Sequence, residues 1–210
     1  MDISEVLSHQ LRFLREKELH EEIKTQCQVV SLEAGSPVLR DGAYVKVVPI
    51  LLSGLVKVVK EDAGKEFLLY YIYPLESCII SINCGINQLK SRVKAVAEDD
   101  STAILIPAHL VGEWQRKYHS FNEFILNLYQ KRFDDALDAF NALAFQSLDE
   151  RLLSYLRVKA DAIENKVIKM THQELSDQLG TTRETVSRML KKLEVEDRIV
   201  LKRGTIEILL

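Results

Sequence analysis

The chain has 210 residues, of which 47% are hydrophobic, and this is enough for one large domain or two small ones with cores of their own. The net charge of −3 argues against a protein that coats nucleic acid over its whole surface, and no apolar run approaches the roughly 18 residues of a membrane span. The first residues lack the pattern of a secretory signal, so we expect a cytoplasmic protein that does not enter membranes.

The charge is divided unevenly along the chain. Residues 1–148 carry a net charge of −4, whereas residues 149–210 carry +1. Residues 183–203 alone hold seven basic and four acidic side chains. An anionic partner is therefore expected at the C-terminal end.

Cysteines and histidines give no pattern of a metal or cofactor site. Cys27, Cys78 and Cys84 are an odd number and show no C-x-x-C spacing, whereas an iron–sulfur cluster usually takes four cysteines. We expect buried, unreactive thiols in a reducing compartment. His109 and His119 are each isolated near a predicted helix start, which is typical of capping or surface residues. No metal and no cofactor are predicted.

Between Val29 and Pro107, short apolar runs alternate with turn signals. The runs are VVSL, VVPILL, LVKVV and FLLYYIY, separated by segments rich in Gly, Ser, Pro and Asp. Runs of this length and composition predict an antiparallel sandwich or barrel of short strands. In the segment EDAGKE, Gly64 supplies the positive φ that a hairpin turn needs.

From about residue 121 to residue 148 the hydrophobic period changes to three and four, which predicts a helix of about 25 residues and roughly 37 Å. Its apolar stripe consists of Phe121, Ile125, Leu128, Ala136, Phe140 and Leu143, and Arg132 interrupts it. Because this length exceeds what a small sandwich covers, we predict that the stripe packs against its copy in a homodimer. The alternative is a helix folded entirely onto its own sandwich.

Three further helices and a pair of strands are predicted after residue 146. The first helix is SLDERLLSYLRVKAD; the second opens with a capping box of Thr171 and Glu174 and ends at Gly180. The third is GTTRETVSRMLKKLE, and RIVLKRGTIEIL predicts two strands joined at Arg203 and Gly204. Two helices joined by a short turn with glycine indicate a helix-turn-helix, whose second helix enters the DNA major groove.

The second helix of this motif has two distinct faces. The apolar residues Val186, Met189, Leu190 and Leu193 lie within about 100° of one another around the helix axis, which predicts a core face. The opposite face and the first turn carry Arg183, Glu184, Ser187 and Arg188. Arginine donates two hydrogen bonds to guanine, and a carboxylate accepts one from the cytosine amino group. Arg183, Glu184 and Arg188 are therefore predicted to read bases.

Short polar and basic side chains around this helix suit contacts with DNA phosphates, which position a protein without specifying a sequence. The predicted phosphate contacts are Thr171, Gln173, Thr182, Thr185, Lys191, Lys192, Lys202 and Arg203. For the four basic residues the alternative is an ordinary solvated surface. For Glu184 the alternative is a capping box with Thr181.

The segment MTHQELSDQLGTTRETVSRMLKKLEVEDRIVLKRGTIEIL closely resembles the DNA-binding end of the Crp/Fnr family of bacterial transcription regulators. The order of parts also resembles that family along nearly the whole chain. The resemblance implies that the motif R-E-T-V-x-R supplies the base-reading residues, here Arg183, Glu184 and Arg188, and that Ser187 occupies a position that the oxygen-sensing branch uses for an added base contact. It also implies an inverted-repeat operator with half-sites resembling TGTGA or TTGA, and RNA polymerase as a partner.

The N-terminal resemblance is looser. Gly35, Gly42, Gly54 and Gly64 fall where the β-roll turns of the family carry glycine, and LLSGLVKVV is similar to its central strand pair. Cyclic-nucleotide binders of the family have a Gly-Glu pair and, about ten residues later, an Arg-Ser pair.

This chain departs from that nucleotide signature. It has Leu75-Glu76 and then, fourteen residues beyond Glu76, Lys90-Ser91-Arg92, so lysine replaces the planar fork with which arginine grips phosphate. Glu76, Lys90, Ser91 and Arg92 are the candidate effector-pocket residues. The departures predict that the effector is not a cyclic nucleotide or is unknown.

We therefore predict an α+β protein with three parts. Residues 1–118 form an antiparallel β-roll resembling the cyclic-nucleotide-binding jelly roll, residues 119–146 a dimerisation helix, and residues 147–210 a winged helix-turn-helix that binds double-stranded DNA. The predicted function is a homodimeric, non-enzymatic transcription regulator. The alternatives are a cyclic-nucleotide-responsive regulator, a winged helix that binds protein, and a cupin-like enzyme, for which the segment Val29–Pro107 has no metal-binding histidine.

Overall fold

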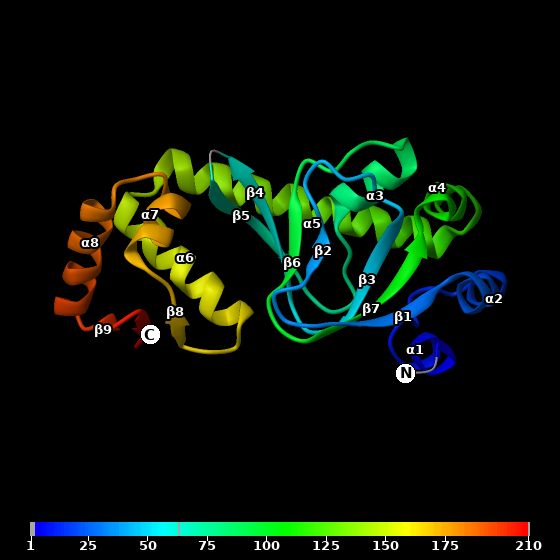
Figure 1. Ribbon diagram of the computed structural model, residues 1–210, viewed down its shortest axis with the longest axis horizontal. Coiled ribbons are helices and arrows are strands. Elements are labelled where there is room, and N and C mark those ends of the chain that lie inside the picture. Colours follow the sequence, from blue (N-terminus) through cyan, green and yellow to red (C-terminus); the bar gives the residue numbers. More distant parts are fainter. Residues whose placement is uncertain (1–2, 63, 210) are drawn as a thin grey trace. The chain divides into compact units, whose positions relative to one another are not determined.

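The computed structural model describes residues 3–62 and 64–209 of the chain (Figure 1). Ala63 of the predicted EDAGKE turn and the first two residues of the N-terminal segment lie outside the described residues. The chain divides into two compact units, one containing the residues up to Glu61 with Leu68–Ala136, and the other containing Asp62–Phe67 with Leu137–Leu210.

The first unit contains two antiparallel sheets, as the alternation of apolar runs and turns predicted. One sheet has the order β1-β7-β3, and the other has the order β2-β6-β4-β5. The strands are β1 (Gln28–Leu32), β2 (Pro37–Leu39), β3 (Val47–Ser53), β4 (Val56–Asp62), β5 (Lys65–Ile72), β6 (Lys94–Ala97) and β7 (Ser101–Pro107). Sequence neighbours such as β1 and β2 lie in different sheets, which gives the roll its crossovers (Figure 1).

Gly54 shows why the turn between β3 and β4 requires glycine. Its φ is +86°, a left-handed backbone conformation that residues other than glycine rarely adopt. A Cβ at this position would lie 2.2 Å from Ser101 Oγ and 2.7 Å from Ser101 Cα. The close passage of the β7 backbone therefore fixes the residue type. Gly64, in the β4–β5 hairpin, has the predicted positive φ of +78°.

Helices form the larger core of the first unit together with residues of β3 and β7. The helices are α1 (Ile3–His9), α2 (Lys17–Gln26), α3 (Ile79–Asn87), α4 (Ala108–Lys117) and α5 (His119–Phe145), of which the residues up to Ala136 belong to this unit. The first two helices were not among the predicted elements. Leu11, Leu14 and Leu19 of this segment are fully buried with Trp114 and Ile125, so the N-terminal helices complete the core of the β-roll.

The carboxylate of Glu22 fastens α2 to α4. It accepts hydrogen bonds from Trp114 Nε1 at 2.5 Å, Tyr118 Oη at 2.6 Å and Lys117 Nζ at 2.6 Å. The hydrogen bonds from Lys117 and Tyr118, more than that from Trp114, lower the pKa of Glu22 to about 2. The ionised carboxylate is thus part of the folded structure.

The long helix α5 has 27 residues and is about 40 Å long, close to the predicted length. The predicted dimer stripe is wrong in its first half. Phe121, Ile125, Leu128 and Arg132 are buried within the subunit, because the α1–α2 segment, α4 and the β-roll cover that face. Ala136, Phe140 and Leu143 of the same prediction are exposed.

A second apolar stripe on α5 is exposed, and Phe140 is its one member that belongs to the predicted stripe. It consists of Leu126, Tyr129, Phe133, Leu137 and Phe140, each at least 39% exposed. Spacings of three and four residues place these side chains on one face of the helix. An exposed apolar stripe of this kind marks an interaction surface.

The second unit is built from three helices and a three-stranded sheet. Its elements are α6 (Leu148–Ala162), β8 (Val167–Lys169), α7 (His172–Leu179), α8 (Arg183–Val195), β9 (Ile199–Lys202) and β10 (Thr205–Ile208), and the sheet order is β8-β10-β9. The predicted capping box of Thr171 and Glu174 is present, and Gly180 ends α7 with a φ of +65°. Gly204 makes the predicted turn with a φ of +74°.

No helix in the described part of the chain is both long enough and apolar enough to cross a membrane.

Candidate DNA-binding site and sensory core

Local signals set where the predicted recognition helix α8 begins. Thr182 is the N-cap, and its hydroxyl accepts a hydrogen bond from the backbone N–H of Thr185 at 3.2 Å. A capping box between Thr181 and Glu184 is therefore absent, and that alternative for Glu184 is wrong. Since the N-cap is Thr182 and not Thr181, Glu184 occupies the second position of the helix and is not needed for capping.

The packed face of α8 is the predicted one. Val186, Met189, Leu190 and Leu193 are all at most 5% exposed. They pack in one core with residues of α6, α7 and the strands β9 and β10. This core holds α8 beside α7 and fixes which side of the helix faces outward (Figure 1).

The opposite face of α8 presents a free carboxylate between free guanidinium groups. Arg183, Glu184 and Arg188 are exposed, and none of them has a side-chain hydrogen bond or ion pair with another described residue. Because no internal partner holds them, these side chains are available to a partner outside the chain. Ser187, on the same face, is half-buried and hydrogen-bonded to His172.

The predicted phosphate contacts have roles within the subunit. Thr171 and Thr182 cap α7 and α8, and Gln173 donates to Ser176 and Asp177 at 3.2 Å. Lys191, Lys192 and Lys202 form ion pairs with Glu194, Asp149 and Glu207 at 2.7, 2.5 and 2.7 Å. The three lysines are all more than half exposed, and exposed pairs of this kind contribute only about 0–1 kcal/mol, so a phosphate can replace the carboxylate at little cost. Arg203 is exposed at the β9–β10 turn.

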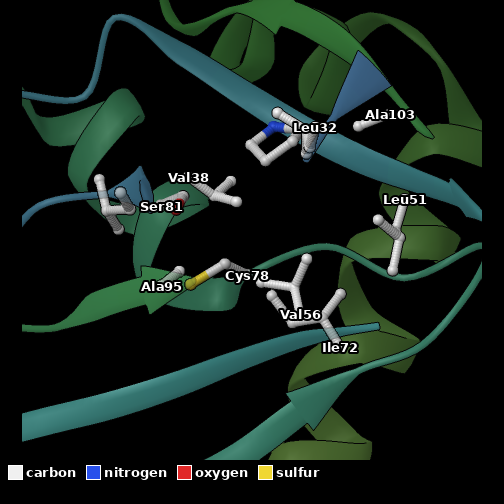
Figure 2. Close-up of a pocket in the computed structure, with 11 residues that line it drawn as sticks. Leu32, Val38, Leu51, Val56, Ile72, Cys78, Ser81, Ala95 and Ala103 are labelled. Carbon is white, nitrogen blue, oxygen red and sulfur yellow. The ribbon is translucent and has the colours of Figure 1, made fainter. Parts of the chain in front are cut away.

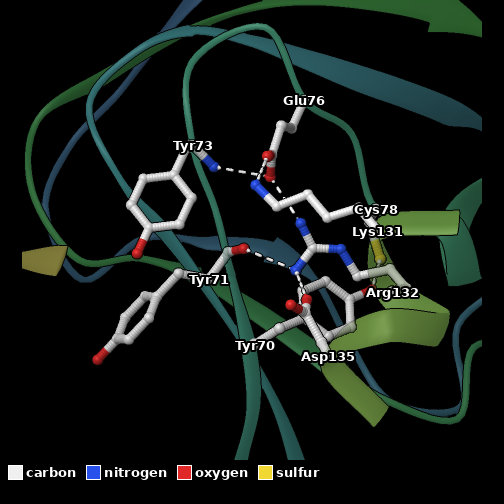
Figure 3. A network of polar contacts seen from close by, with 8 residues as sticks. All are labelled: Tyr70, Tyr71, Tyr73, Glu76, Cys78, Lys131, Arg132 and Asp135. Atoms are coloured by element: carbon white, nitrogen blue, oxygen red, sulfur yellow. Dashed lines mark hydrogen bonds and ion pairs between the residues drawn. The ribbon is translucent and has the colours of Figure 1, made fainter. Parts of the chain in front are cut away.

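In the first unit, Glu76 binds residues of α5 (Figure 3). Its Oε2 lies 2.8 Å from Arg132 Nη2, and its Oε1 pairs with Lys131. Arg132 is buried, and its Nη1 donates to the carboxylate of Asp135 at 2.8 Å and to the backbone oxygen of Tyr71 at 3.3 Å. The connector after β5 is thus joined to α5 by a largely buried ion pair between residues 56 positions apart.

The rings of Tyr70 and Tyr73 lie beside the basic members of this network (Figure 3). The guanidinium carbon of Arg132 lies 4.5 Å from the ring centroid of Tyr70, a cation–π distance. The hydroxyl of Tyr70 lies 3.4 Å from Cys78 Sγ. Burial, and secondly the neighbouring Cys78, raise the pKa of the Tyr70 hydroxyl, so it stays protonated.

The other candidate effector residues do not join Glu76. Among the described residues, the Glu76 carboxylate contacts Lys131, Arg132 and the backbone N–H of Tyr73, and not the segment 90–92. Lys90 lies over the ring of Tyr44 at 5.5 Å, and Arg92 is exposed. The Ser91 hydroxyl is buried and exchanges hydrogen bonds with the backbone of Val93.

The space between the two sheets is a small apolar cavity (Figure 2). Its volume is about 10 Å³, which is near the minimum for a single water molecule. The side chains around it include Val38, Leu51, Val56, Ile72 and Cys78. Pockets for small molecules usually have volumes of about 300–1,000 Å³, so the interior of the roll is packed in this structure.

The three cysteines are buried and free, as predicted. Burial raises the pKa of Cys27 to about 12 and also raises the pKa of Cys84, so these thiols stay protonated. His119 pairs with Glu123 at 3.0 Å at the start of α5. In the part of the chain that the structure describes, no three His, Cys, Asp or Glu side chains are grouped to hold a metal ion.

Comparisons with known proteins agree with this geometry. Residues 150–209 match the family of Crp-like helix-turn-helix domains. A search of curated proteins found no match to the chain.

Solved structures resemble the chain over most of its length. A Crp/Fnr family protein from Eubacterium rectale is 24% identical with a TM-score of 0.79, covering 92% of this chain and 90% of that chain. The c-di-GMP responsive global regulator CLP of Xanthomonas campestris is 18% identical with a TM-score of 0.73, covering 92% and 99%. A Crp/Fnr family transcriptional regulator of Thermus thermophilus is 22% identical with a TM-score of 0.72, covering 87% and 93%.

The fold and the C-terminal domain together define a transcription-regulator architecture with a helix-turn-helix DNA-binding domain. The chain has the fold of the Crp/Fnr regulators, and its residues 150–209 form a Crp-like helix-turn-helix domain.

Proposed function

We propose that the protein is a homodimeric transcription regulator that reads an inverted-repeat DNA operator through α8. The observation that carries the proposal is the outward face of α8, where Glu184 is free between Arg183 and Arg188. A surface that binds only phosphates has no use for a carboxylate, which phosphates repel. A surface that reads bases uses arginine for guanine and a carboxylate for cytosine.

Selection from random double-stranded DNA tests this reading. We expect an enriched inverted repeat with half-sites resembling TGTGA or TTGA, and half-site centres about 34 Å apart. The affinity should fall steeply as salt rises, because bound phosphates release counterions. A protein-binding winged helix, the alternative, would select no sequence and would show no such salt dependence.

Two substitutions distinguish sequence-specific binding to bases from non-specific binding to DNA phosphates. Arg188→Ala should weaken binding to the selected operator by about 1–3 kcal/mol and leave non-specific binding nearly unchanged. Arg157→Ala is the matched control, because Arg157 is an exposed arginine on α6, outside the motif. Equal losses on operator and random DNA for Arg188→Ala would show that this residue contacts only phosphate.

We place the dimer contact on the exposed stripe of α5 formed by Leu126, Tyr129, Phe133, Leu137 and Phe140. Support comes from its helical spacing and from the exposure of Phe133 and Phe140, at 64% and 68%. Phe133→Glu should convert the dimer to a monomer in sedimentation experiments. Asn127→Glu, on an exposed face of the same helix beside the stripe, should leave the dimer intact. A dimer that persists with Phe133→Glu would place the contact elsewhere.

We further propose that the β-roll responds to a signal other than a cyclic nucleotide, and that the regulator acts with RNA polymerase. The proposal about the signal is supported by Glu76, which is held by Arg132 and Lys131, and by the packed interior of the roll. The proposal about RNA polymerase follows from the resemblance to the Crp/Fnr family. Titration with cyclic AMP, cyclic GMP and c-di-GMP should give no saturable rise in melting temperature. The third ligand is included because the structurally similar CLP is described as c-di-GMP responsive. A saturable rise with cyclic AMP or cyclic GMP would favour the cyclic-nucleotide-responsive alternative.

A further inference from the structure

A chain of two hydrogen bonds connects the start of α7 to the recognition helix α8. Nδ1 of His172, the first residue of α7, lies 2.8 Å from Ser187 Oγ. Ser187 Oγ in turn donates to the backbone oxygen of Arg183, one turn earlier in α8, at 2.9 Å. His172 and Ser187 are both half-buried, so this chain lies at the edge of the exposed face of α8.

The hydrogen bond from Ser187 Oγ to the backbone oxygen of Arg183 assigns the positions of the hydrogen atoms in this chain. A backbone carbonyl only accepts, so the single hydrogen of the Ser187 hydroxyl points to Arg183. Ser187 Oγ therefore accepts from His172, whose Nδ1 must carry a hydrogen. Both the Nδ1–H neutral form and the doubly protonated form of histidine meet this requirement. Ser187 then has no hydrogen left to donate and one lone pair left to accept.

We infer that His172 is a positioning residue for DNA recognition, because it fixes Ser187 as a hydrogen-bond acceptor. This inference rests on the proposed function, in which α8 reads bases. In the major groove, an acceptor meets the amino groups of adenine and cytosine, whereas guanine and thymine present acceptors at the corresponding edge. Ser187 thus selects an amino base at the position that it faces. A serine without this constraint contacts bases of either kind.

Affinity profiling over every operator position tests the inference. Full-length protein is measured on duplexes that carry each of the four bases at each half-site position. Ser187→Ala identifies the position that Ser187 reads, as the one where base preference is lost. For the unaltered protein we expect adenine or cytosine to be favoured there by about 3- to 10-fold, the effect of one hydrogen bond.

His172→Phe keeps a ring but removes the donor, so this preference should fall toward one. Preferences that depend on Arg188 should stay unchanged. His172→Asn is the conservative control, because its amide N–H₂ group can donate in place of Nδ1–H, and it should restore the preference. A His172 that only stabilises the fold would lower binding to all operators alike.

Several results would overturn the inference. They are a preference for guanine or thymine at the Ser187 position, an unchanged preference in His172→Phe, and no position that responds to Ser187→Ala. The base preference of the unaltered protein and the response to Ser187→Ala need no His172 variant, so these two results test the inference even if His172→Phe folds poorly. Failure of the proposed function is distinct, since the unaltered protein would then select no sequence at all.

Discussion

Replacing Glu76 with alanine should destabilise the first unit by about 3 kcal/mol, because the substitution leaves the guanidinium of Arg132 buried without its main carboxylate partner. The side chain of Arg132 is 6% exposed, and the pair is joined at 2.8 Å. Breaking a buried pair by removing one member usually costs about 3–5 kcal/mol. The cost should lie at the low end here, since Asp135 remains at 2.8 Å from Arg132. Asp135 is 47% exposed, so water screens that contact and compensation is partial.

Urea unfolding followed by tryptophan fluorescence measures this loss. Trp114 is the single tryptophan of the chain, is fully buried, and lies in the same unit as Glu76 and Arg132. Its signal therefore reports on the affected unit and not on the helix-turn-helix. A loss below about 1 kcal/mol would refute the view that the buried guanidinium depends on Glu76.

A double variant tests whether the loss comes from the unpaired charge of Arg132. The double variant Glu76→Met with Arg132→Met removes both charges and keeps apolar side chains of similar length. Replacement of a buried ion pair by apolar residues is often neutral or stabilising, so the double variant should recover most of the loss. If the loss in free energy of unfolding of the double variant instead equals the sum of the losses of Glu76→Met and Arg132→Met, the two side chains do not stabilise each other.

Two further predictions concern the same unit. The pKa of Glu22 is lowered from 4.5 to about 2, so its contribution to stability is complete above pH 4.5 and is lost as the pH falls toward 2. Glu22→Gln should flatten that part of the stability profile measured by urea unfolding, and parallel profiles for the two proteins would contradict this. Gly54→Ala combines backbone strain of about 1–3 kcal/mol with a clash against Ser101, whereas Gly42→Ala has a similar positive φ and nothing within 4 Å. Thermal unfolding should therefore show a larger loss for Gly54→Ala, and equal losses would mean that the β7 backbone moves aside.

The helix-turn-helix was predictable because its signals are local. The capping box of Thr171 and Glu174, the glycine at position 180 and the apolar face of α8 all lie within one short segment of sequence. Each feature specifies a helix boundary or a buried face without help from distant residues. Thr181 and Thr182 are both acceptable caps by residue type, and only the folded turn selects Thr182, which excludes the alternative capping box of Thr181 and Glu184.

The first half of the dimer stripe was mispredicted because periodicity does not tell which segment of the chain covers a helix face. Phe121 and Ile125 have the spacing of an interface, but the N-terminal leucines and Trp114 cover them within the subunit. Helices α1 and α2, which supply part of that cover, precede the β-roll in sequence and lie about a hundred residues from α5. The exposed stripe that includes Leu126 and Phe133 becomes apparent only when the covered face is known.

The amino-acid sequence by itself determined the order of parts, the two faces of α8 and the residues Arg183, Glu184 and Arg188 on its outer face, since these depend on local period and capping. Only the tertiary structure decided what the remaining polar groups do. Glu76 meets Arg132 across 56 residues, and His172 meets Ser187 from a different helix. Such contacts depend on how distant segments pack, and no spacing in the sequence records which side chains will meet when the chain folds.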